Sequence, residues 1–364
     1  MALIMTTNHR IFILTTCILS IFLGIWIYFL CTPAIIGGQA FKYRVNQGAS
    51  IRSVSADLTK QQVIKHPFLF NLLIYFRRDT RNLKSGEYLF QKGATPSRIL
   101  DQMVQGTGMV YHPFTIVPGW TFRQVREAIL KNNEIHHTIQ TLSDTEVMTR
   151  LGYPNVNPEG EFFPDTYYFV EGVPDLAVLK MALHAMQYKL NQAWQQRAAD
   201  LPFQTSYEAL VAASIIEKEA YYNSEKPIIA GVMVNRLRKN MLLQFDPTVI
   251  YGLGDRYDGT IHHADLREDT PYNTYVRKGL TPTPISMPSL ASIQAAVQPT
   301  QHDYLYFVAR SDKTHQFSKS LIEHNQAVKS VSMNSLWFFN DKLVQYQLLK
   351  VMSQHNRSQY AGLF

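Results

Sequence analysis

The sequence predicts an α+β protein with a single N-terminal transmembrane helix, a small α+β module and a larger mixed α+β catalytic domain. Three observations lead to this prediction. Residues 11–31 form one uncharged, almost wholly apolar run, strand-like and helical patterns alternate from residue 41 onward, and a later apolar helix pattern ends in charged residues. The expected organisation is a cytoplasmic tail at 1–10, a transmembrane helix at 11–31, a small module at 41–107, the catalytic domain at 108–345 and a C-terminal tail at 346–364.

The N-terminal apolar run is long enough to cross a bilayer. Roughly 20 apolar residues span the hydrocarbon core, whereas the apolar part of a cleaved signal peptide has about 7–15, so residues 11–31 favour an anchor. Cleavage after Ala40, in Gly-Gln-Ala, is the alternative. Arg10 precedes the run and Lys42 and Arg44 follow it, so charge fixes the orientation only weakly. A short tail before a large domain favours a signal anchor with the domain exported.

Composition narrows the classes of chemistry and partner. Both cysteines, Cys17 and Cys31, lie in the apolar run, so the exported part has no disulfide, cysteine zinc site or cysteine nucleophile. The net charge of +7 fits an acidic partner such as an anionic glycan or lipid. No Lys/Arg run exceeds two residues, so nucleic acid is not expected as a partner. The pair His262-His263 and the later histidines lack metal-ligand spacing, and neither a metal nor another cofactor is expected.

Residues 41–107 alternate between strand and helix patterns. A strand is expected at 41–45, a helix from residue 51 with one apolar face, a strand at 87–90 and a helix at 95–103. This order, opened by Val-x-x-Gly-x-Ser-Ile at 45–51, resembles LysM modules, which are small glycan-binding folds. A structural spacer is the alternative.

The remaining elements of the larger domain follow in order. A strand is expected at 110–117, a helix at 122–131, a polar turn-rich stretch at 141–157, an acidic and aromatic stretch at 159–169, a long helix at 176–198 and a terminal helix at 343–364.

Glu217 is the strongest candidate for catalysis. It is the first charge after the apolar run 210–216, on a helix that should begin near Ser206, because Thr205 followed by Glu208 has the spacing of a capping box. Helical periodicity places Glu217 on an apolar face. Burial there should raise the pKa of the carboxyl, as a general acid requires. The alternative is that Glu217 only marks where a buried helix reaches the surface.

Glu219 should differ from Glu217 in its surroundings. It lies about 200° further round the helix and follows Lys218. We therefore interpret Glu219 as a solvated or ion-paired residue.

A series of motifs surrounds Glu217, all in one order along the chain. They are Glu-Gly…Phe-Pro-Asp-Thr-Tyr at 159–167, Ala-Ser-Ile-Ile-Glu-Lys-Glu at 213–219, Ala-Gly-Val-Met-Val-Asn-Arg-Leu at 230–237, Leu-Gln-Phe-Asp-Pro-Thr at 243–248, Pro-Tyr-Asn-Thr-Tyr at 271–275, Pro-Ile-Ser-Met-Pro-Ser at 284–289 and Tyr-Leu-Tyr-Phe-Val-Ala at 304–309. Together they resemble the YceG-like family of endolytic murein transglycosylases, from the membrane anchor to about residue 330. One departure is Phe245, where the family commonly has a small polar residue.

The resemblance implies a single-pass inner-membrane enzyme with a cytoplasmic N-terminus and a periplasmic body. Such enzymes cleave the MurNAc–GlcNAc bond of peptidoglycan without water and leave 1,6-anhydro-MurNAc ends. The resemblance further implies that nascent glycan strands are terminated or trimmed near peptidoglycan synthases, which are possible partners. The catalytic glutamate of the family falls on Glu217.

One carboxylate is enough for this chemistry. Ordinary glycosidases use two carboxyl groups, but here the C6 hydroxyl of the sugar attacks and no water needs activation. Glu217 is expected to act as acid and then as base. Residues expected to bind substrate are Gln244, Asp246, Tyr251, Asn273, Thr274 and Tyr275, each of which could instead form turns or core packing.

Two other functions remain as alternatives. A hydrolytic muramidase would need a base such as Asp246 to activate water, and an anchored, non-catalytic peptidoglycan-binding protein would need only the small module. Glu159, Glu161 and Asp165 form a second acidic cluster, which we interpret as structural or as part of a cleft rim.

Overall fold

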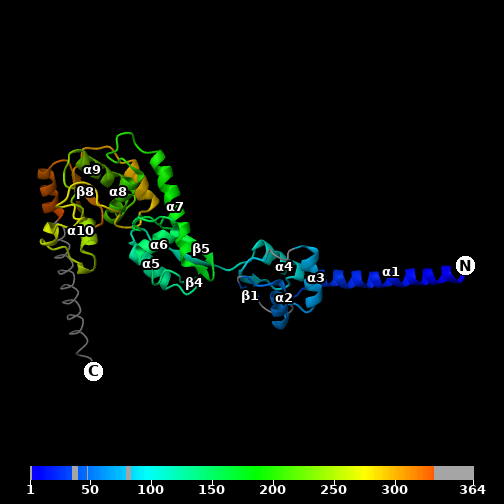
Figure 1. Cartoon of the computed structure of the whole chain (residues 1–364). Coiled ribbons are helices and arrows are strands. Elements are labelled where there is room, and N and C mark those ends of the chain that lie inside the picture. Colours follow the sequence, from blue (N-terminus) through cyan, green and yellow to red (C-terminus); the bar gives the residue numbers. More distant parts are fainter. Residues whose placement is uncertain (1, 35–39, 47, 79–82, 332–364) are drawn as a thin grey trace, which may run out of the picture. The chain divides into compact units, whose positions relative to one another are not determined.

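The computed structural model describes residues 2–34, 40–46, 48–78 and 83–331. The chain divides into two compact units, the first made of residues 1–114, 132–137 and 168–174 and the second of residues 115–131, 138–167 and 175–364. Figure 1 shows the order of the elements along the chain. The terminal helix predicted at 343–364 and the tail at 346–364 lie outside the described residues.

The N-terminal helix α1 covers Ala2–Cys31. Its segment Ile11–Cys31 is long and apolar enough to cross a membrane, as an anchor or as a signal sequence. The helix ends at the first unit, where Phe29 and Ala34 are buried in the core. The end of α1 is therefore part of the packing of that unit.

The first unit combines a two-stranded antiparallel sheet with three short helices. Between residues 41 and 105 its elements are β1 (Phe41–Val45), α2 (Ile51–Lys60), α3 (Pro67–Phe76), β2 (Gly86–Phe90) and α4 (Pro96–Gln105). β1 and β2 are antiparallel, with Phe41 opposite Phe90 and Val45 opposite Gly86. These strands and the helices α2 and α4 confirm the predicted order, whereas α3 was not predicted.

Further strands and helices lead to the helix that carries Glu217. They are β3 (Tyr111–Thr115), α5 (Phe122–Leu130), β4 (Ile135–His136), α6 (Asp144–Leu151), β5 (Thr166–Val170), β6 (Val173–Pro174) and α7 (Asp175–Gln195). β3 pairs with β5, and β4 pairs with β6. α6 lies in the stretch that was expected to be only turns, and β5 lies in the aromatic stretch that was given no strand.

The core of the second unit surrounds α8 (Ser206–Glu219), whose residues from Ala209 to Ile216 are all buried. It packs against α7, α9 (Lys226–Arg238), α10 (Asp246–Leu253) and α11 (Leu290–Val297). Two 3-10 turns, η1 (Gly254–Arg256) and η2 (Asp265–Arg267), follow α10, and the antiparallel pair β7 (Tyr306–Ala309) and β8 (His315–Ser318) comes last. A helix buried on all sides fixes the position of any side chain at its end.

We expect Thr121→Ala to destabilise the second unit by about 1 kcal/mol, because it removes a helix cap. The Thr121 hydroxyl accepts from Gln124 N at 3.4 Å, and Gln124 Oε1 accepts from Thr121 N at 2.9 Å, which closes a capping box on α5. Urea unfolding measures the change. Thr145→Ala, at an exposed threonine inside α6, is the matched control and should change stability by less than about 0.5 kcal/mol. Equal effects of the two substitutions would contradict the capping role.

Candidate active site

Glu217 lies in the last turn of α8, directly after the buried residues Ala209 to Ile216. The helix begins as predicted, because the Thr205 hydroxyl accepts from Glu208 N at 3.2 Å. The reciprocal bond of the capping box is absent among the described residues, since Glu208 Oε2 accepts from Gln204 N at 2.6 Å instead. The prediction of the helix start is confirmed, although the cap is half of the expected box.

The carboxylate of Glu217 is bound on one side only. Oε2 accepts from Lys226 Nζ at 3.0 Å, from Ser289 N at 2.9 Å, from Ser289 Oγ at 2.5 Å and from Ser292 Oγ at 2.6 Å. None of the described residues donates to Oε1. The side chains of Glu217 and Lys226 are only 9% and 4% exposed, so the ion pair is buried and the carboxylate is held in one orientation.

This arrangement corrects the predicted pKa of Glu217. Burial raises the pKa, as the sequence suggested, but the hydrogen bonds from Ser289 and Ser292 and the charge of Lys226 together outweigh burial. The pKa is therefore lowered below its ordinary value, and the resting group is a carboxylate instead of a carboxylic acid.

The partners of Glu217 come from the starts of two helices. Lys226 is the first residue of α9, and Ser289 caps the N-terminus of α11 by accepting from Ser292 N at 3.4 Å. A helix N-terminus stabilises a nearby negative charge. Sequence reasoning missed all three side chains, although the Pro-Ser pair at 288–289, with a serine three residues later, was a visible helix-start signal.

A cleft of about 1200 Å³ lies in the second unit beside this site. Lys218, next to Glu217, lines the cleft, and its ammonium donates to Gly119 O at 3.3 Å. A Cβ on Gly119 would stand 4.0 Å from Glu217 Cγ, which places the turn at residues 118–121 beside the carboxylate. Tyr251 and Tyr272 also line the cleft, and their rings meet edge to face at 4.8 Å. The cleft thus has aromatic and charged walls.

A second buried carboxyl group, Glu159, lines this cleft, whereas Glu217 is not among the lining residues. Glu159 accepts from Phe122 N at 3.0 Å and from the Tyr251 hydroxyl at 3.1 Å. Burial raises its pKa to about 7, against the lowering effect of these hydrogen bonds. Burial likewise raises the pKa of Glu161 to about 7, whereas Asp165 is exposed. The structure therefore separates the acidic cluster into two buried acids and one surface residue.

The six residues predicted to bind substrate fall into distinct places. Only Tyr251 lines the cleft. Asp246, in the first turn of α10, accepts from the Tyr275 hydroxyl at 2.5 Å. Gln244 is exposed, has a φ of 52° and accepts a 3.4 Å bond from Arg236.

The last two of the six, Asn273 and Thr274, are buried in a loop. The Asn273 amide donates to Asp265 O and Glu268 O and accepts from Tyr275 N. The Thr274 hydroxyl accepts from Phe245 N at 3.0 Å and bonds the Thr248 hydroxyl at 2.8 Å. Their polar atoms build the loop, which is the structural alternative noted for them.

The interpretation of Glu219 as a solvated or ion-paired residue was wrong. Its Oε2 is buried without a hydrogen-bond partner. Burial, with a smaller contribution from the charge of Asp246, raises the pKa of Glu219 to about 8. Asp246 belongs to the first turn of α10, a helix that packs against α8.

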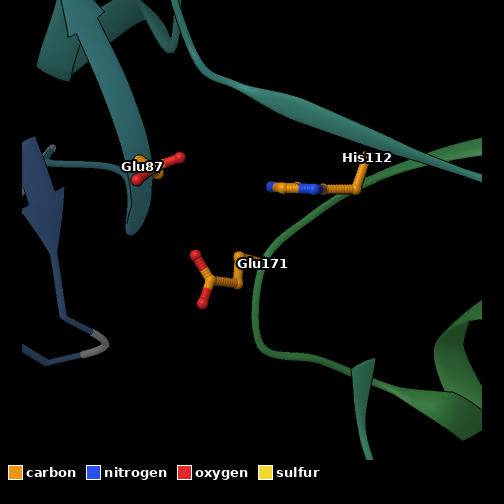
Figure 2. Close-up of side chains that lie close together, drawn as sticks. All are labelled: Glu87, His112 and Glu171. Atoms are coloured by element: carbon orange, nitrogen blue, oxygen red, sulfur yellow. The ribbon is translucent and has the colours of Figure 1, made fainter. Parts of the chain in front are cut away.

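One group of described side chains could offer three ligands to a cation, within the first unit. Glu87, His112 and Glu171 place ligand atoms within 4.8 Å of one another, and Figure 2 shows the His112 ring directed toward the two carboxylates. Each carboxylate already has a basic partner, since Glu87 pairs with Lys42 at 3.5 Å and Glu171 with Arg44. A cation would have to compete with both ion pairs, so we assign no metal to this group.

An oriented carboxylate and a second buried acid beside a cleft with aromatic walls are the kinds of group that acid–base catalysis uses. Residues 43–330 match the model of the YceG-like family. The chain belongs to this family.

Two curated relatives share the name endolytic murein transglycosylase. The chain is 31% identical over 301 residues to an endolytic murein transglycosylase of Bacillus subtilis, which covers 78% of this chain and 82% of the relative. It is 27% identical over 297 residues to an endolytic murein transglycosylase of Streptococcus pneumoniae, which covers 73% of this chain and 53% of the relative. The chain thus spans about half the length of the streptococcal protein.

Among solved structures, the chain is similar to a yceG-like protein from Listeria monocytogenes, determined at 2.6 Å. The two are 29% identical, with a TM-score of 0.48, over 79% of this chain and 98% of that chain.

Proposed function

We propose that this protein is a membrane-anchored endolytic lytic transglycosylase of peptidoglycan, with Glu217 as its catalytic acid and base. The observation that carries the proposal is the one-sided binding of the Glu217 carboxylate. Four donors fix Oε2, and no described residue donates to Oε1. A fixed carboxylate with one available oxygen is suited to move a proton along a defined path.

The reaction requires two proton transfers at the same carboxyl group. Protonated Glu217 gives its proton to the glycosidic oxygen while the bond from C1 of MurNAc to that oxygen breaks. The C6 hydroxyl of the same sugar then attacks C1, and its proton returns to Glu217. No water is consumed, and the ring closes to a 1,6-anhydro product. The intramolecular attack gains from proximity.

The lowered pKa of Glu217 sets a condition on the first step. The resting carboxylate is in the basic form, so a proton must be bound before the leaving oxygen can be protonated. A glycan that covers Oε1 removes its remaining contact with water, and added desolvation raises a carboxyl pKa. Substrate binding is therefore expected to favour the acid form that the reaction needs.

The cleft supports a glycan as the substrate. Tyr251 and Tyr272 offer rings that can stack on sugar faces, and Lys218 places a positive charge beside Glu217. Net charge of +7 fits a wall polymer that carries carboxylates. Of the residues predicted to bind substrate, Tyr251 has the best-supported position. The other five, Gln244, Asp246, Asn273, Thr274 and Tyr275, stay predictions.

The remaining parts of the proposal concern location. The apolar segment Ile11–Cys31 supports an anchor in the inner membrane, with the N-terminus in the cytoplasm and the body in the periplasm. The two-stranded sheet and the helices of the first unit support a LysM-like module that contacts glycan. An anchored body of this kind would act on nascent strands, beside peptidoglycan synthases.

Hydrolysis is the second candidate, and one observation favours it. Glu159 lines the cleft and its pKa is raised to about 7, so it is better placed than Asp246 to activate water as a base. Asp246 does not line this cleft and is bonded to Tyr275.

Mass analysis of the products separates the candidates. Purified peptidoglycan is digested with the full chain in detergent. The full chain is used because Phe29 and Ala34 belong to the core of the first unit and an N-terminal truncation would remove them. We expect anhydro-muramyl ends. Reducing ends, heavier by one water, would establish a hydrolase and direct attention to Glu159. Binding without cleavage would favour an anchored binding protein.

A further inference from the structure

Helix α3 exposes an aromatic face that its own unit does not cover. Phe68 and Tyr75 are each 71% exposed and Phe76 is 64% exposed, while Phe70, Leu73 and Ile74 of the same helix are buried in the core. Residues 68, 72, 75 and 76 have the spacing of one helix face. Three large aromatic side chains gathered on one short helix are more than the scattered exposure that soluble surfaces show.

This face lies where α1 enters the unit. Figure 1 shows α3 on the side of the first unit from which α1 emerges. The Phe76 ring contacts the Trp26 ring edge to face at 5.9 Å, and Trp26 also stacks on Phe22 at 6.4 Å. Phe29, one turn later, is buried in the core of the unit. The aromatic face of α3 is therefore continuous with the apolar surface of the transmembrane helix.

The length of the apolar segment gives the depth of this contact. Trp26 precedes the end of the segment at Cys31 by five residues, which is about 7.5 Å along a helix. The hydrocarbon core is about 30 Å thick, so the segment just spans it. With Ile11–Cys31 in the hydrocarbon core of the bilayer, Trp26 lies inside the outer boundary of that hydrocarbon core. Phe76, which contacts Trp26, lies at the same depth. A shift of α1 toward the outer side of the membrane would draw the charge of Arg10 into the hydrocarbon core of the bilayer, which is unfavourable.

We propose that α3 is an interfacial membrane helix, which inserts Phe68, Tyr75 and Phe76 into the outer surface of the bilayer beside α1. This inference rests on the proposed membrane anchor. Aromatic side chains favour the membrane–water interface, and an interfacial helix buries its apolar face by about 5–10 Å. The exposed Lys65 and Arg78 flank α3, so anionic headgroups would add attraction at both of its ends.

The consequence is that the first unit rests on the membrane. A helix that lies in the interface, together with a spanning helix packed into the same core, holds the unit by two elements. The two-stranded sheet β1–β2, which belongs to this unit, is then kept near the lipid surface.

Lipid quenching of a fluorophore tests the inference on the full chain. Tyr75→Cys is made with Cys17→Ser and Cys31→Ser, labelled with an environment-sensitive dye and reconstituted into vesicles of phosphatidylethanolamine and phosphatidylglycerol. Phe68→Cys is a second variant at an equally exposed position. The matched control is Tyr111→Cys on β3 of the same unit, where the side chain is 54% exposed. Cys17, labelled in a Cys31→Ser chain, reports insertion of the span.

We expect brominated lipids to remove most of the fluorescence at positions 75, 68 and 17, and iodide in the water to quench position 111. Quenching of positions 75 and 68 by iodide, with Cys17 still quenched by lipid, would overturn the inference while the anchor stands. The exposed face would then belong to a protein partner. Quenching of Cys17 by iodide would remove the anchor, and the inference with it.

Discussion

Glu217→Gln is expected to slow glycan cleavage by at least about 10²–10⁴-fold, the contribution typical of a general acid–base group. The amide keeps the shape of the carboxyl group and can still accept from Ser289 and Ser292, but it cannot deliver a proton to the glycosidic oxygen or take one from the C6 hydroxyl. The rate of formation of anhydro-muramyl ends measures the loss, and binding to peptidoglycan should persist.

A stability control is needed, because Glu217→Gln also leaves the buried positive charge of Lys226 without its partner. Lys226 is 4% exposed and pairs with Glu217 at 3.0 Å. Removal of one partner of a buried ion pair destabilises a protein by about 3–5 kcal/mol. The double variant Glu217→Gln with Lys226→Met removes both charges, so it should recover much of the stability without recovering cleavage. A stable double variant that cleaves would exclude Glu217 as the acid and favour Glu159.

Periodicity predicted the elements whose two faces differ in polarity. The strands β1 and β2 and the helices α2, α4 and α5 each have one apolar and one polar face, and their boundaries were predicted to within a few residues. α3 escaped because it is apolar on nearly all sides, with a buried face and an exposed aromatic face. α6 is polar apart from its inner face, but Ser143 and Glu146 form a capping box that could have revealed it.

The position of Glu217 at the end of a buried helix was predictable from the sequence, but its protonation state was not. The end of an apolar helix locates Glu217, because only the local sequence is needed. Its pKa depends on Ser289 and Ser292, which are 72 and 75 residues away in the chain. The pKa of Glu219 likewise depends on burial in the folded chain and on the charge of Asp246, at the start of α10. Two glutamates on one helix turn thus acquired opposite pKa shifts from contacts that no local pattern encodes.

Glu219→Gln is expected to stabilise the protein at pH 8 and to leave its stability unchanged near pH 4. Burial raises the pKa of Glu219 from an ordinary 4.5 to about 8 in the folded state. Between these values the unfolded chain releases the proton while the folded chain keeps it, so ionisation favours unfolding more strongly as pH rises. Each pKa unit corresponds to about 1.4 kcal/mol, so neutralisation should raise the free energy of unfolding by a few kcal/mol at pH 8.

Urea unfolding of wild type and variant from pH 4 to pH 9 measures this effect as a difference that grows with pH and levels off above about pH 8. The matched control is Glu127→Gln on α5, at a carboxyl group that is exposed to water in the folded chain. The control should give no such slope. A difference for Glu219→Gln that stayed constant across this range would mean that the carboxyl group ionises as easily in the folded chain as in the unfolded one. The sign of the slope also separates the two glutamates. The contribution of Glu217 to the free energy of unfolding decreases as pH falls below 4.5, because its pKa is lowered in the folded chain. The contribution of Glu219 decreases as pH rises above 4.5, because its pKa is raised.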